Sequence, residues 1–314
     1  MSMENTTARL VLGTMDYGTR VDGERAFALM DRFVEAGGVW LDTANCYSFW
    51  EDDSGVGGAS ERVIGEWLRA RDGIRGEVKL ATKVRQNPLV PHRWPESAEG
   101  LSAEAIVAGV SGSVERLGIE TIDLLWAHAE DRSVPLAETV TAFGVLVDDG
   151  VALRVGAANH PAWRVEQGRT IAQSVGAEPW TALQLRHSLV QPRPGAVLPN
   201  AGHRHLTGDD LDYATSGGLD VWAYTPLLHG GYVRADKPFP DAYDHPGTTR
   251  VLRVLDDVAA ETGATRNQVV RAWLLHQGIS PIIGVSSLAQ LDEALDAAQV
   301  TLQDEHMSRF ASAR

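Results

Sequence analysis

Short apolar segments alternate with longer amphipathic segments along almost the whole chain. The apolar segments lie at residues 10–12, 39–42, 78–83, 122–128, 154–159, 182–186, 220–224 and 281–285. Most are near-continuous apolar runs, which predict β-strands buried on both faces, as in a parallel sheet. The amphipathic segments predict helices at residues 24–36, 60–71, 102–117, 136–149, 161–175, 209–213, 249–262, 266–276 and 288–298.

Strands and helices alternate without a linker or a low-complexity segment, so we expect one domain that spans residues 1–314. Eight repeats favour closure of the sheet into a barrel, the (β/α)8 or TIM-barrel class of α/β folds, which typically takes about 250 residues. The surplus falls in three long segments, 85–101, 191–208 and 228–248. Each follows a predicted strand, so we expect all three loops at the C-terminal face of the strands, where such loops are often functional.

Ionisable side chains stand at or just beyond the ends of three predicted strands. They are Asp42 and Tyr47 after the second strand, Lys83 at the end of the third and His128 at the end of the fourth. Strand ends at one face of a parallel barrel converge on a single pocket, so we expect these side chains to meet there. A carboxylate, a phenol, an ammonium and an imidazole in one pocket can transfer a proton near neutral pH, which indicates an enzyme.

Composition and charge narrow the class of protein. The 314 residues are 44% hydrophobic, enough for a substantial core, yet no apolar run approaches the length of about 20 residues that a membrane helix requires. The formal net charge of −14 opposes binding to nucleic acids and to acidic lipid surfaces, so we expect a small-molecule partner. Cys46 is the only cysteine, which excludes an intramolecular disulfide, and residues 1–7 lack the pattern of a secretory signal. We therefore expect a cytoplasmic protein, either a monomer or a homo-oligomer.

A series of short motifs makes the chain resemble the aldo-keto reductase family. The first are Asp42-Thr43-Ala44 with Tyr47, Ala81-Thr82-Lys83, and His128 in the position of the family's fourth-strand histidine. Further motifs follow in the family's order at residues 134–139, 154–159, 184, 223–227, 283–287 and 290–291. Each motif alone is weak, whereas the ordered series is specific and covers nearly the whole chain.

The resemblance implies reduction of an aldehyde or ketone to an alcohol with a nicotinamide cofactor. Hydride addition leaves charge on the carbonyl oxygen, so a nearby acid must supply a proton. The resemblance gives this role to Tyr47, with Lys83 lowering the pKa of the phenol from its usual value near 10. Asp42 would hold Lys83 charged and oriented, and His128 would orient the carbonyl group.

The resemblance also implies which residues bind the cofactor. Asn159 and Gln184 would hydrogen-bond the carboxamide, Tyr224 would stack on the nicotinamide ring, and the loop from Gly284 would surround the adenosine phosphate. The complete set is Thr14, Met15, Asp42, Asn159, Gln184, Tyr224, Pro226, Leu227, Gly284, Ser286, Gln290 and Glu293. There is no G-x-G-x-x-G turn, so the cofactor would not bind a Rossmann domain, and no metal is expected.

The chain departs from the family pattern near the expected cofactor site. Three positions carry a residue that is unusual in the family: Ala158, Ala294 and His187. More importantly, the last loop, residues 286–290, has no arginine or lysine for the 2′-phosphate of NADP. The resemblance favours NADP, but a phosphate held without arginine loses charge-assisted bonds, so we expect weak discrimination between NADP and NAD. Arg234 or Arg266 could supply a cation from another part of the chain.

Two other functions remain open at this stage. Lys83 could form a Schiff base with a carbonyl substrate in a lyase or aldolase, a chemistry that barrels also host. The chain could also be a regulatory subunit that binds a nucleotide and turns over slowly, as some members of the family are.

Other residues also have alternative interpretations. Cys46 could be a nucleophile with His128 as its base, although a lone cysteine near an apolar strand end more often packs in the core. Trp67 and Trp273 are predicted to be core residues, whereas Trp50, Trp94 and Trp126 are expected either to line an apolar substrate wall or simply to pack. Five loop histidines match no metal-ligand spacing and are expected to be solvated: His92, His203, His205, His229 and His245.

Overall fold

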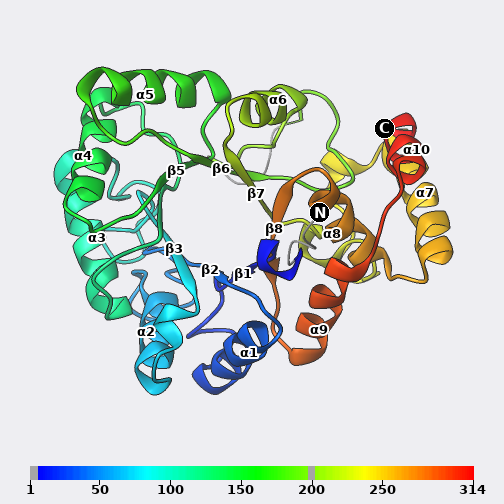
Figure 1. Ribbon diagram of the computed structural model, residues 1–314, viewed down its shortest axis with the longest axis horizontal. Coiled ribbons are helices and arrows are strands. Elements are labelled where there is room, and N and C mark those ends of the chain that lie inside the picture. The colour runs from blue at the N-terminus through cyan, green and yellow to red at the C-terminus, as the bar shows by residue number, and fades with distance from the viewer. Residues whose placement is uncertain (1–5, 197–201) are drawn as a thin grey trace.

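Eight parallel strands close into a barrel in sequence order, β1-β2-β3-β4-β5-β6-β7-β8, in a computed structural model that describes residues 6–196 and 202–314. The helices surround the barrel (Figure 1). The strands are β1 Val11–Gly13, β2 Trp40–Asp42, β3 Lys79–Val84, β4 Leu124–Ala127, β5 Val155–Ala158, β6 Ala182–Arg186, β7 Asp220–Tyr224 and β8 Ile279–Gly284. The α-helices are α1 Gly23–Glu35, α2 Ala59–Ala70, α3 Ala103–Leu117, α4 Leu136–Asp148, α5 Ala162–Val175, α6 Gly208–Ser216, α7 Pro246–Thr262, α8 Arg266–His276, α9 Leu288–Asp296 and α10 Asp304–Ala313. The predicted TIM-barrel class is confirmed.

The predicted elements differ from the observed ones mainly at their ends. β4 ends at Ala127, one residue before His128, and β8 begins at Ile279, two residues before the predicted start at Pro281. Helix α10 was not predicted at all; it packs against α7 near the C-terminal end of the chain (Figure 1). Among the described residues, no helix is long and apolar enough to cross a membrane.

A layer of side chains closes the barrel interior below the strand ends. We name this layer the floor; it includes Trp40, Ala81, Trp126, Ala182 and Trp222. Trp126 of β4 and Trp222 of β7 meet edge to face with their ring centroids 5.2 Å apart, and Trp40 of β2 meets Trp222 at 5.1 Å. Gly156 of β5 makes room for this floor, because a Cβ atom there would lie 2.5 Å from Cζ3 of Trp126. Trp126 is fully buried, so of the two alternatives for this residue, a substrate wall or packing, packing is correct.

Side chains two positions beyond the floor lie on the same interior face, because successive residues of a strand point to opposite faces. The pairs of floor residue and following residue are Trp40 and Asp42, Ala81 and Lys83, Trp126 and His128, Ala182 and Gln184, and Trp222 and Tyr224. The two-residue alternation therefore points five of the predicted site residues into the barrel interior, on the C-terminal side of the floor.

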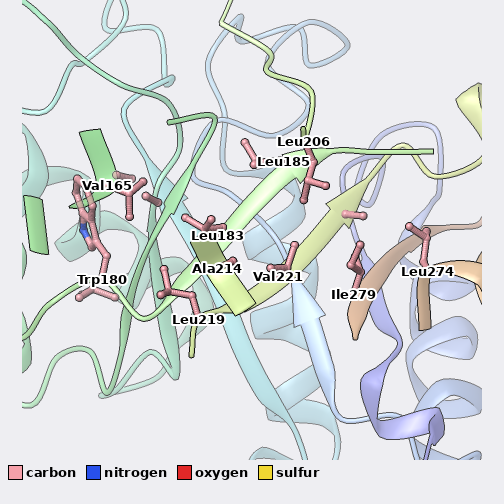
Figure 2. Packing of buried hydrophobic residues seen from close by; sticks show 14 of the residues in the cluster. Val165, Trp180, Leu183, Leu185, Leu206, Ala214, Leu219, Val221, Leu274 and Ile279 are labelled. Atoms are coloured by element: carbon pink, nitrogen blue, oxygen red, sulfur yellow. The ribbon is translucent and has the colours of Figure 1, made fainter. Parts of the chain in front are cut away.

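The opposite faces of the strands build the main hydrophobic core with the surrounding helices. Figure 2 shows Leu183 and Leu185 of β6 and Val221 of β7 in one cluster with Ala214 of α6 and Leu274 of α8. Burying a leucine side chain of this kind stabilises the fold by about 1.5–3 kcal/mol. This packed core holds the strand ends, which carry the predicted site residues, in fixed positions.

The three long loops pack against the strand ends and against each other. Residues 202–206 run alongside β6, where the backbone N–H of Arg186 donates to the carbonyl of Arg204 at 2.9 Å. The backbone N–H of Arg193 donates to the carbonyl of Ala242 at 2.7 Å, which joins the second loop to the third. Residues 197–201 of the predicted second loop lie outside the described residues. Short 3₁₀ helices occur at Thr6–Arg9, Ile74–Gly76, Leu228–Gly230, Asp241–Tyr243 and Ala297–Gln299.

Candidate active site

Lys83 connects three predicted site residues in one hydrogen-bonded group. Its Nζ atom donates to Oδ2 of Asp42 at 2.6 Å, to the backbone carbonyl of Thr43 at 2.7 Å and to the hydroxyl oxygen of Tyr47 at 2.8 Å. Lys83 and Asp42 are both buried. Since an ammonium has three hydrogens to donate, these acceptors use all of them and hold Lys83 between the carboxylate and the phenol.

Tyr47 is positioned by a tight turn that follows β2. Its backbone N–H donates to the carbonyl of Ala44 at 3.2 Å. The next residue, Ser48, has a φ of 70° and donates its hydroxyl hydrogen to the carbonyl of Met15 at 2.7 Å. The turn that carries the phenol is therefore anchored to the loop after β1.

His128 completes the predicted group from the end of β4. Its backbone N–H continues the sheet by donating to the carbonyl of Val84 at 3.0 Å. The imidazole ring lies edge to face with the ring of Tyr47, with centroids 5.9 Å apart. Its Nδ1 atom lies 3.6 Å from Sγ of Cys46, and Nε2 makes no hydrogen bond within the described residues. The structure thus brings Asp42, Tyr47, Lys83 and His128 together.

Burial sets the protonation states of the group. It raises the pKa of the Tyr47 phenol well above its usual range, and the Asp42 carboxylate acts in the same direction. Burial also raises the pKa of Asp42 and lowers that of Lys83, while their ion pair opposes both shifts. The pKa of His128 falls well below its usual value, first because of burial and then because of Lys83. Burial therefore outweighs the lowering of the Tyr47 pKa that we expected from Lys83, and the phenol and a neutral imidazole are the forms present at neutral pH.

Asn159, Gln184 and Tyr224 lie next to this group at the barrel mouth. The Nε2 atom of Gln184 donates to Oδ1 of Asp42 at 3.1 Å, and the Nδ2 atom of Asn159 donates to the carbonyl of His128 at 3.0 Å. The hydroxyl of Tyr224 donates to Oδ1 of Asn159 at 2.7 Å. Asn159 has a φ of 57°, a left-handed conformation that asparagine tolerates better than most residues. Two side-chain amides and an aromatic ring are thus held in fixed positions beside the phenol.

A sequence model of the aldo/keto reductase family matches residues 9–314. The chain belongs to the aldo/keto reductase family. The resemblance seen in the motifs is therefore confirmed, and it extends over nearly the whole barrel.

Named relatives of this aldo/keto reductase point to the same type of reaction. The chain is 30% identical to norsolorinic acid reductase stcV of Emericella nidulans over 95% of this chain and 76% of the relative. It is 29% identical to the uncharacterized oxidoreductase YrpG of Bacillus subtilis, over 95% of this chain and 89% of the relative. It is also 27% identical to the aryl-alcohol dehydrogenase GME11368 of Pestalotiopsis microspora, over 96% of this chain and 77% of the relative. The protein is an oxidoreductase, and its family supports carbonyl reduction in general.

The segment after β8 ends in the exposed N-terminus of helix α9. Ser287 caps this helix by accepting a hydrogen bond from the backbone N–H of Gln290 at 3.3 Å. Oε1 of Gln290 accepts from the backbone N–H of Ser286 at 2.8 Å and from its hydroxyl at 3.2 Å. Gly284, Ser286 and Gln290 are all exposed. A helix N-terminus favours a phosphate group, although this loop adds no cation of its own.

The two arginines that could replace the missing cation are paired within the chain. Arg234 forms an exposed ion pair with Asp236. Arg266 binds Asp256 through Nε at 2.6 Å and Nη2 at 2.8 Å, and its Nη1 donates to the carbonyl of Tyr232 at 2.8 Å. Neither arrangement favours an additional phosphate contact.

Thr14 and Met15 occupy the loop after β1. The hydroxyl of Thr14 donates to the carbonyl of Asp42 at 3.0 Å and lies 2.9 Å from the hydroxyl of Ser60 in α2. Thr14 is fully buried, whereas Met15 is 40% exposed. The side chain of Thr14 therefore serves packing between β1 and α2, and Met15 is the member of this pair that a ligand can reach.

Three further predicted cofactor residues also have partners in the protein. The carbonyl of Pro226 accepts from the hydroxyl of Ser188 at 2.6 Å, and Leu227 packs against the main core. Oε1 of Glu293 accepts from the hydroxyl of Thr265 at 2.7 Å, which ties α9 to the start of α8. Their roles in binding a cofactor stay predictions.

The loop histidines do not form a metal centre within the described residues, where no group of three or more His, Cys, Asp or Glu side chains could hold a metal ion. We expected these histidines to be solvated; His205 and His245 are only partly exposed, and both have partners in the protein. The ring of His205 packs edge to face on Tyr243 with centroids 6.1 Å apart. His245 caps helix α7 by accepting from the backbone N–H of Gly247 at 3.2 Å.

The remaining tryptophans divide between core and mouth. Trp67 and Trp273 are buried, which confirms them as core residues. Trp50 is 43% exposed, and its ring meets that of Phe49 at 5.0 Å. Phe49 in turn meets Trp94 at 5.8 Å. We name Phe49, Trp50 and Trp94 the aromatic rim.

Sequence reasoning missed Glu99, which holds the first long loop to the turn after β2 that carries Tyr47. Its Oε1 atom accepts from Nδ2 of Asn45 at 2.7 Å and from the backbone N–H of Arg85 at 2.6 Å. Nothing in the local sequence around Glu99 predicts these contacts, because Asn45 lies 54 residues away along the chain.

Proposed function

We propose that this protein reduces an aldehyde or a ketone to an alcohol with NADPH or NADH. The observation that carries the proposal is the 2.8 Å hydrogen bond from Nζ of Lys83 to the hydroxyl oxygen of Tyr47. The same ammonium is held on Asp42 at 2.6 Å. Negative charge accumulates on the carbonyl oxygen as it is reduced, and an acid with a fixed cation beside it can neutralise that charge by supplying a proton.

The residues at the mouth fit a nicotinamide cofactor. The second Nδ2 hydrogen of Asn159 and the amide of Gln184 could pair with a carboxamide, and the half-buried ring of Tyr224 offers a stacking surface beside them. The exposed N-terminus of α9, capped by Ser287, suits a phosphate group. When bound, the cofactor supplies a hydride to the carbonyl carbon.

Tyr47 provides the proton in the proposed mechanism. Its phenol transfers a proton to the carbonyl oxygen as the new C–H bond forms, which gives the alcohol and leaves a phenolate. The hydrogen bond from Lys83 stabilises that phenolate. Asp42 keeps Lys83 charged, since a buried ammonium without a counter-ion tends to lose its proton. Tyr47 then recovers a proton from solvent.

His128 acts as a neutral hydrogen-bond donor to the same oxygen. Burial raises the pKa of the Cys46 thiol, so the sulfur keeps its hydrogen and donates it to Nδ1 of His128. The imidazole proton then resides on Nε2, the nitrogen that we assign to the carbonyl oxygen. This assignment makes Cys46 a partner of His128 and argues against a nucleophilic thiolate.

An aromatic carbonyl compound is the substrate class that we favour. Among the relatives, one carries the name aryl-alcohol dehydrogenase and another the name norsolorinic acid reductase. In this chain the aromatic rim of Phe49, Trp50 and Trp94 supports the proposal, because a cluster of aromatic rings attracts a flat aromatic substrate.

The geometry of Lys83 argues against the alternative of a Schiff-base lyase. Its three hydrogens are donated to Asp42, Thr43 and Tyr47, so the nitrogen has no lone pair directed at a substrate. Breaking the contact with Asp42 would also leave a buried carboxylate without its partner, which typically costs about 3–5 kcal/mol.

The proposal is tested by following the oxidation of NADPH and of NADH with benzaldehyde and with acetophenone. We expect turnover with at least one carbonyl compound and binding of the cofactor in a fluorescence titration. Tight cofactor binding without turnover of any aromatic or aliphatic carbonyl compound would instead favour the regulatory subunit.

A further inference from the structure

Arg85 places a positive charge, without an ion-pair partner among the described residues, at the C-terminal mouth of the barrel, just beyond Lys83. It directly follows β3, two residues after Lys83, and it is partly exposed. Its Nη1 atom donates to Oε1 of Gln86 at 2.8 Å, whereas its buried Nε atom has no hydrogen-bond partner. Within residues 6–196 and 202–314, no carboxylate oxygen lies close enough to this guanidinium to form an ion pair.

The backbone of Arg85 is strained, and the strain is held in place by Glu99. Arg85 has a φ of 122°, in the region that favours glycine. Its N–H donates to Oε1 of Glu99 at 2.6 Å, and its carbonyl accepts from the N–H of Gly100 at 3.2 Å. Such strain costs on the order of 1–3 kcal/mol and persists where the surrounding contacts enforce it, often at a functional site.

Gln86 joins the guanidinium to the aromatic rim. Its Oε1 atom accepts both from Nη1 of Arg85 at 2.8 Å and from Nε1 of Trp94 at 3.2 Å. Gln86 is itself buried, so this link is rigid. A cation and an indole ring are thus fixed side by side at the mouth that contains Tyr47 and His128.

The acidic groups around Arg85 make their hydrogen bonds to other groups than its guanidinium, although the charge of Arg85 contributes to the lowered pKa of Asp131. Oδ1 of Asp131 accepts from the backbone N–H of Ser133 at 3.0 Å, and Oδ2 accepts from that of Leu101 at 3.0 Å. Oε1 of Glu99 accepts from Asn45 and from the backbone of Arg85. The titratable groups that face Arg85 from neighbouring elements, His128 and His160, are imidazoles whose pKa values are lowered chiefly by burial.

We propose that Arg85 binds a carboxylate on the substrate, so that the preferred substrate is an aromatic aldehyde or ketone that also carries an acid group. The inference rests on the proposed function and deepens it. In the proposed pose, the carbonyl oxygen lies at Tyr47 and His128 and the ring lies on the aromatic rim. The carboxylate then lies at Arg85, which Gln86 links to Trp94 of that rim. The planar guanidinium matches a carboxylate in two parallel hydrogen bonds, which gives selectivity as well as affinity.

The test compares kcat/KM for 4-carboxybenzaldehyde with that for its methyl ester, which has the same ring and no charge. Wild-type protein should prefer the acid, and Arg85→Met should reduce kcat/KM for the acid by roughly ten- to a hundredfold, mainly through KM, while leaving the ester unchanged. Arg132→Met is the matched control, since Arg132 is an exposed arginine on the same face that is already paired with Glu130 at 3.0 Å. It should leave the ratio of acid to ester unchanged.

Arg85→Gly keeps the test decisive if Arg85→Met folds poorly. Glycine accepts a φ of 122° without strain, so this variant should be at least as stable as the wild type and should also lose the preference for the acid. An equal ratio of acid to ester in the wild type and in Arg85→Gly would overturn the proposal.

Terephthalate binding, followed by tryptophan fluorescence, separates failure of the subsite from failure of the proposed function. If neither aldehyde is reduced but terephthalate binds the wild type and not Arg85→Gly, the carboxylate site stands and the proposed reduction fails. If terephthalate binds both proteins equally, the assignment of Arg85 is wrong whatever the activity.

Discussion

The Sγ atom of Cys46 lies 3.6 Å from Nδ1 of His128, so the residue before Tyr47 contacts the histidine that follows β4. Burial raises the pKa of this thiol, with Glu99 acting in the same direction, and the sulfur therefore remains a donor. One turn after β2 consequently orients both hydrogen-bond donors that we assign to the carbonyl oxygen.

Cys46→Ala should lower kcat by roughly two- to tenfold, since it removes one weak hydrogen bond, worth about 0.5–1.5 kcal/mol, from His128. Cys46→Ser should retain most of the rate, because a hydroxyl can donate to Nδ1 in place of the thiol. The ¹⁵N chemical shifts of the His128 ring report the tautomer directly. Unchanged shifts and rates in both variants would remove Cys46 from the account.

Lys83→Met should be nearly inactive, and its residual rate should depend differently on pH. Alcohol oxidation, the reverse reaction, requires the phenolate of Tyr47. Loss of the ammonium should raise the pKa of this phenol, so the rate of alcohol oxidation should rise only at a higher pH than in the wild type. Asp42→Asn combined with Lys83→Met leaves no unpaired buried carboxylate and serves as a control for folding. An unchanged pH profile, or a substrate adduct on Lys83 after borohydride treatment, would contradict the assigned role.

Acid should destabilise the fold through its buried histidines. His160 donates Nδ1–H to the carbonyl of Ala158 at 2.8 Å, and burial lowers its pKa from 6.5 to about 4. Because this pKa is depressed in the folded state, the unfolded chain binds more protons between these values. The stability is present above pH 6.5 and is lost as the pH falls towards about 4.

At about 1.4 kcal/mol per pKa unit, His160 accounts for roughly 3 kcal/mol of this loss. Urea unfolding across this pH range should therefore show a flatter profile for His160→Gln than for the wild type. Equal slopes in His160→Gln and in the wild type would refute the assignment to His160.

Cofactor preference should be weak, because residues 286–290 carry no cation and Arg234 and Arg266 are paired with Asp236 and Asp256. Gln290→Arg should favour NADPH by roughly tenfold or more, the effect of one charge-assisted bond of about 1.5–3 kcal/mol. Gln290→Met removes the contacts to Ser286 without adding charge and should not favour NADPH. A wild-type preference for NADPH above roughly a hundredfold, about 2.8 kcal/mol, would show that cations elsewhere hold the phosphate.

The convergence of the site residues was predictable because it follows from the two-residue period of strands. Lys83 stands two positions after Ala81, and Gln184 two positions after Ala182, so both share an interior face with the floor. Which apolar residues form the floor depends on how the barrel closes. The sequence alone therefore does not decide whether Trp126 packs in the core or lines a substrate wall, whereas its contact with Trp222 does.

Helix α10 lacks the usual N-cap residue, although Asp304 and Glu305 in its first turn are a recognised start signal. It begins after Gln303, whose side chain and that of His306 form a capping box, whereas serine, threonine, aspartate and asparagine are the residues that usually mark a helix start. The strained φ of Arg85 was equally hidden, since arginine rarely adopts it and the contacts with Glu99 and Gly100 that hold it are not local.

The direction of the Tyr47 pKa was also beyond the sequence. A lysine beside a phenol predicts a lowered pKa, but the depth of the pocket decides the net result, and burial raises it. How deeply the Tyr47 side chain is buried depends on the long loops and on the barrel floor together. No local sequence pattern predicts how these distant segments pack.

The most direct test of the account is the rate of hydride transfer in a single turnover by Tyr47→Phe, measured with saturating cofactor and an aromatic aldehyde. The variant keeps the ring that packs against His128 and removes only the proton donor. We predict a loss of roughly 10²–10⁴ in this rate with unchanged cofactor affinity. A folded Tyr47→Phe protein that transfers hydride at nearly the wild-type rate would show that another group protonates the carbonyl oxygen.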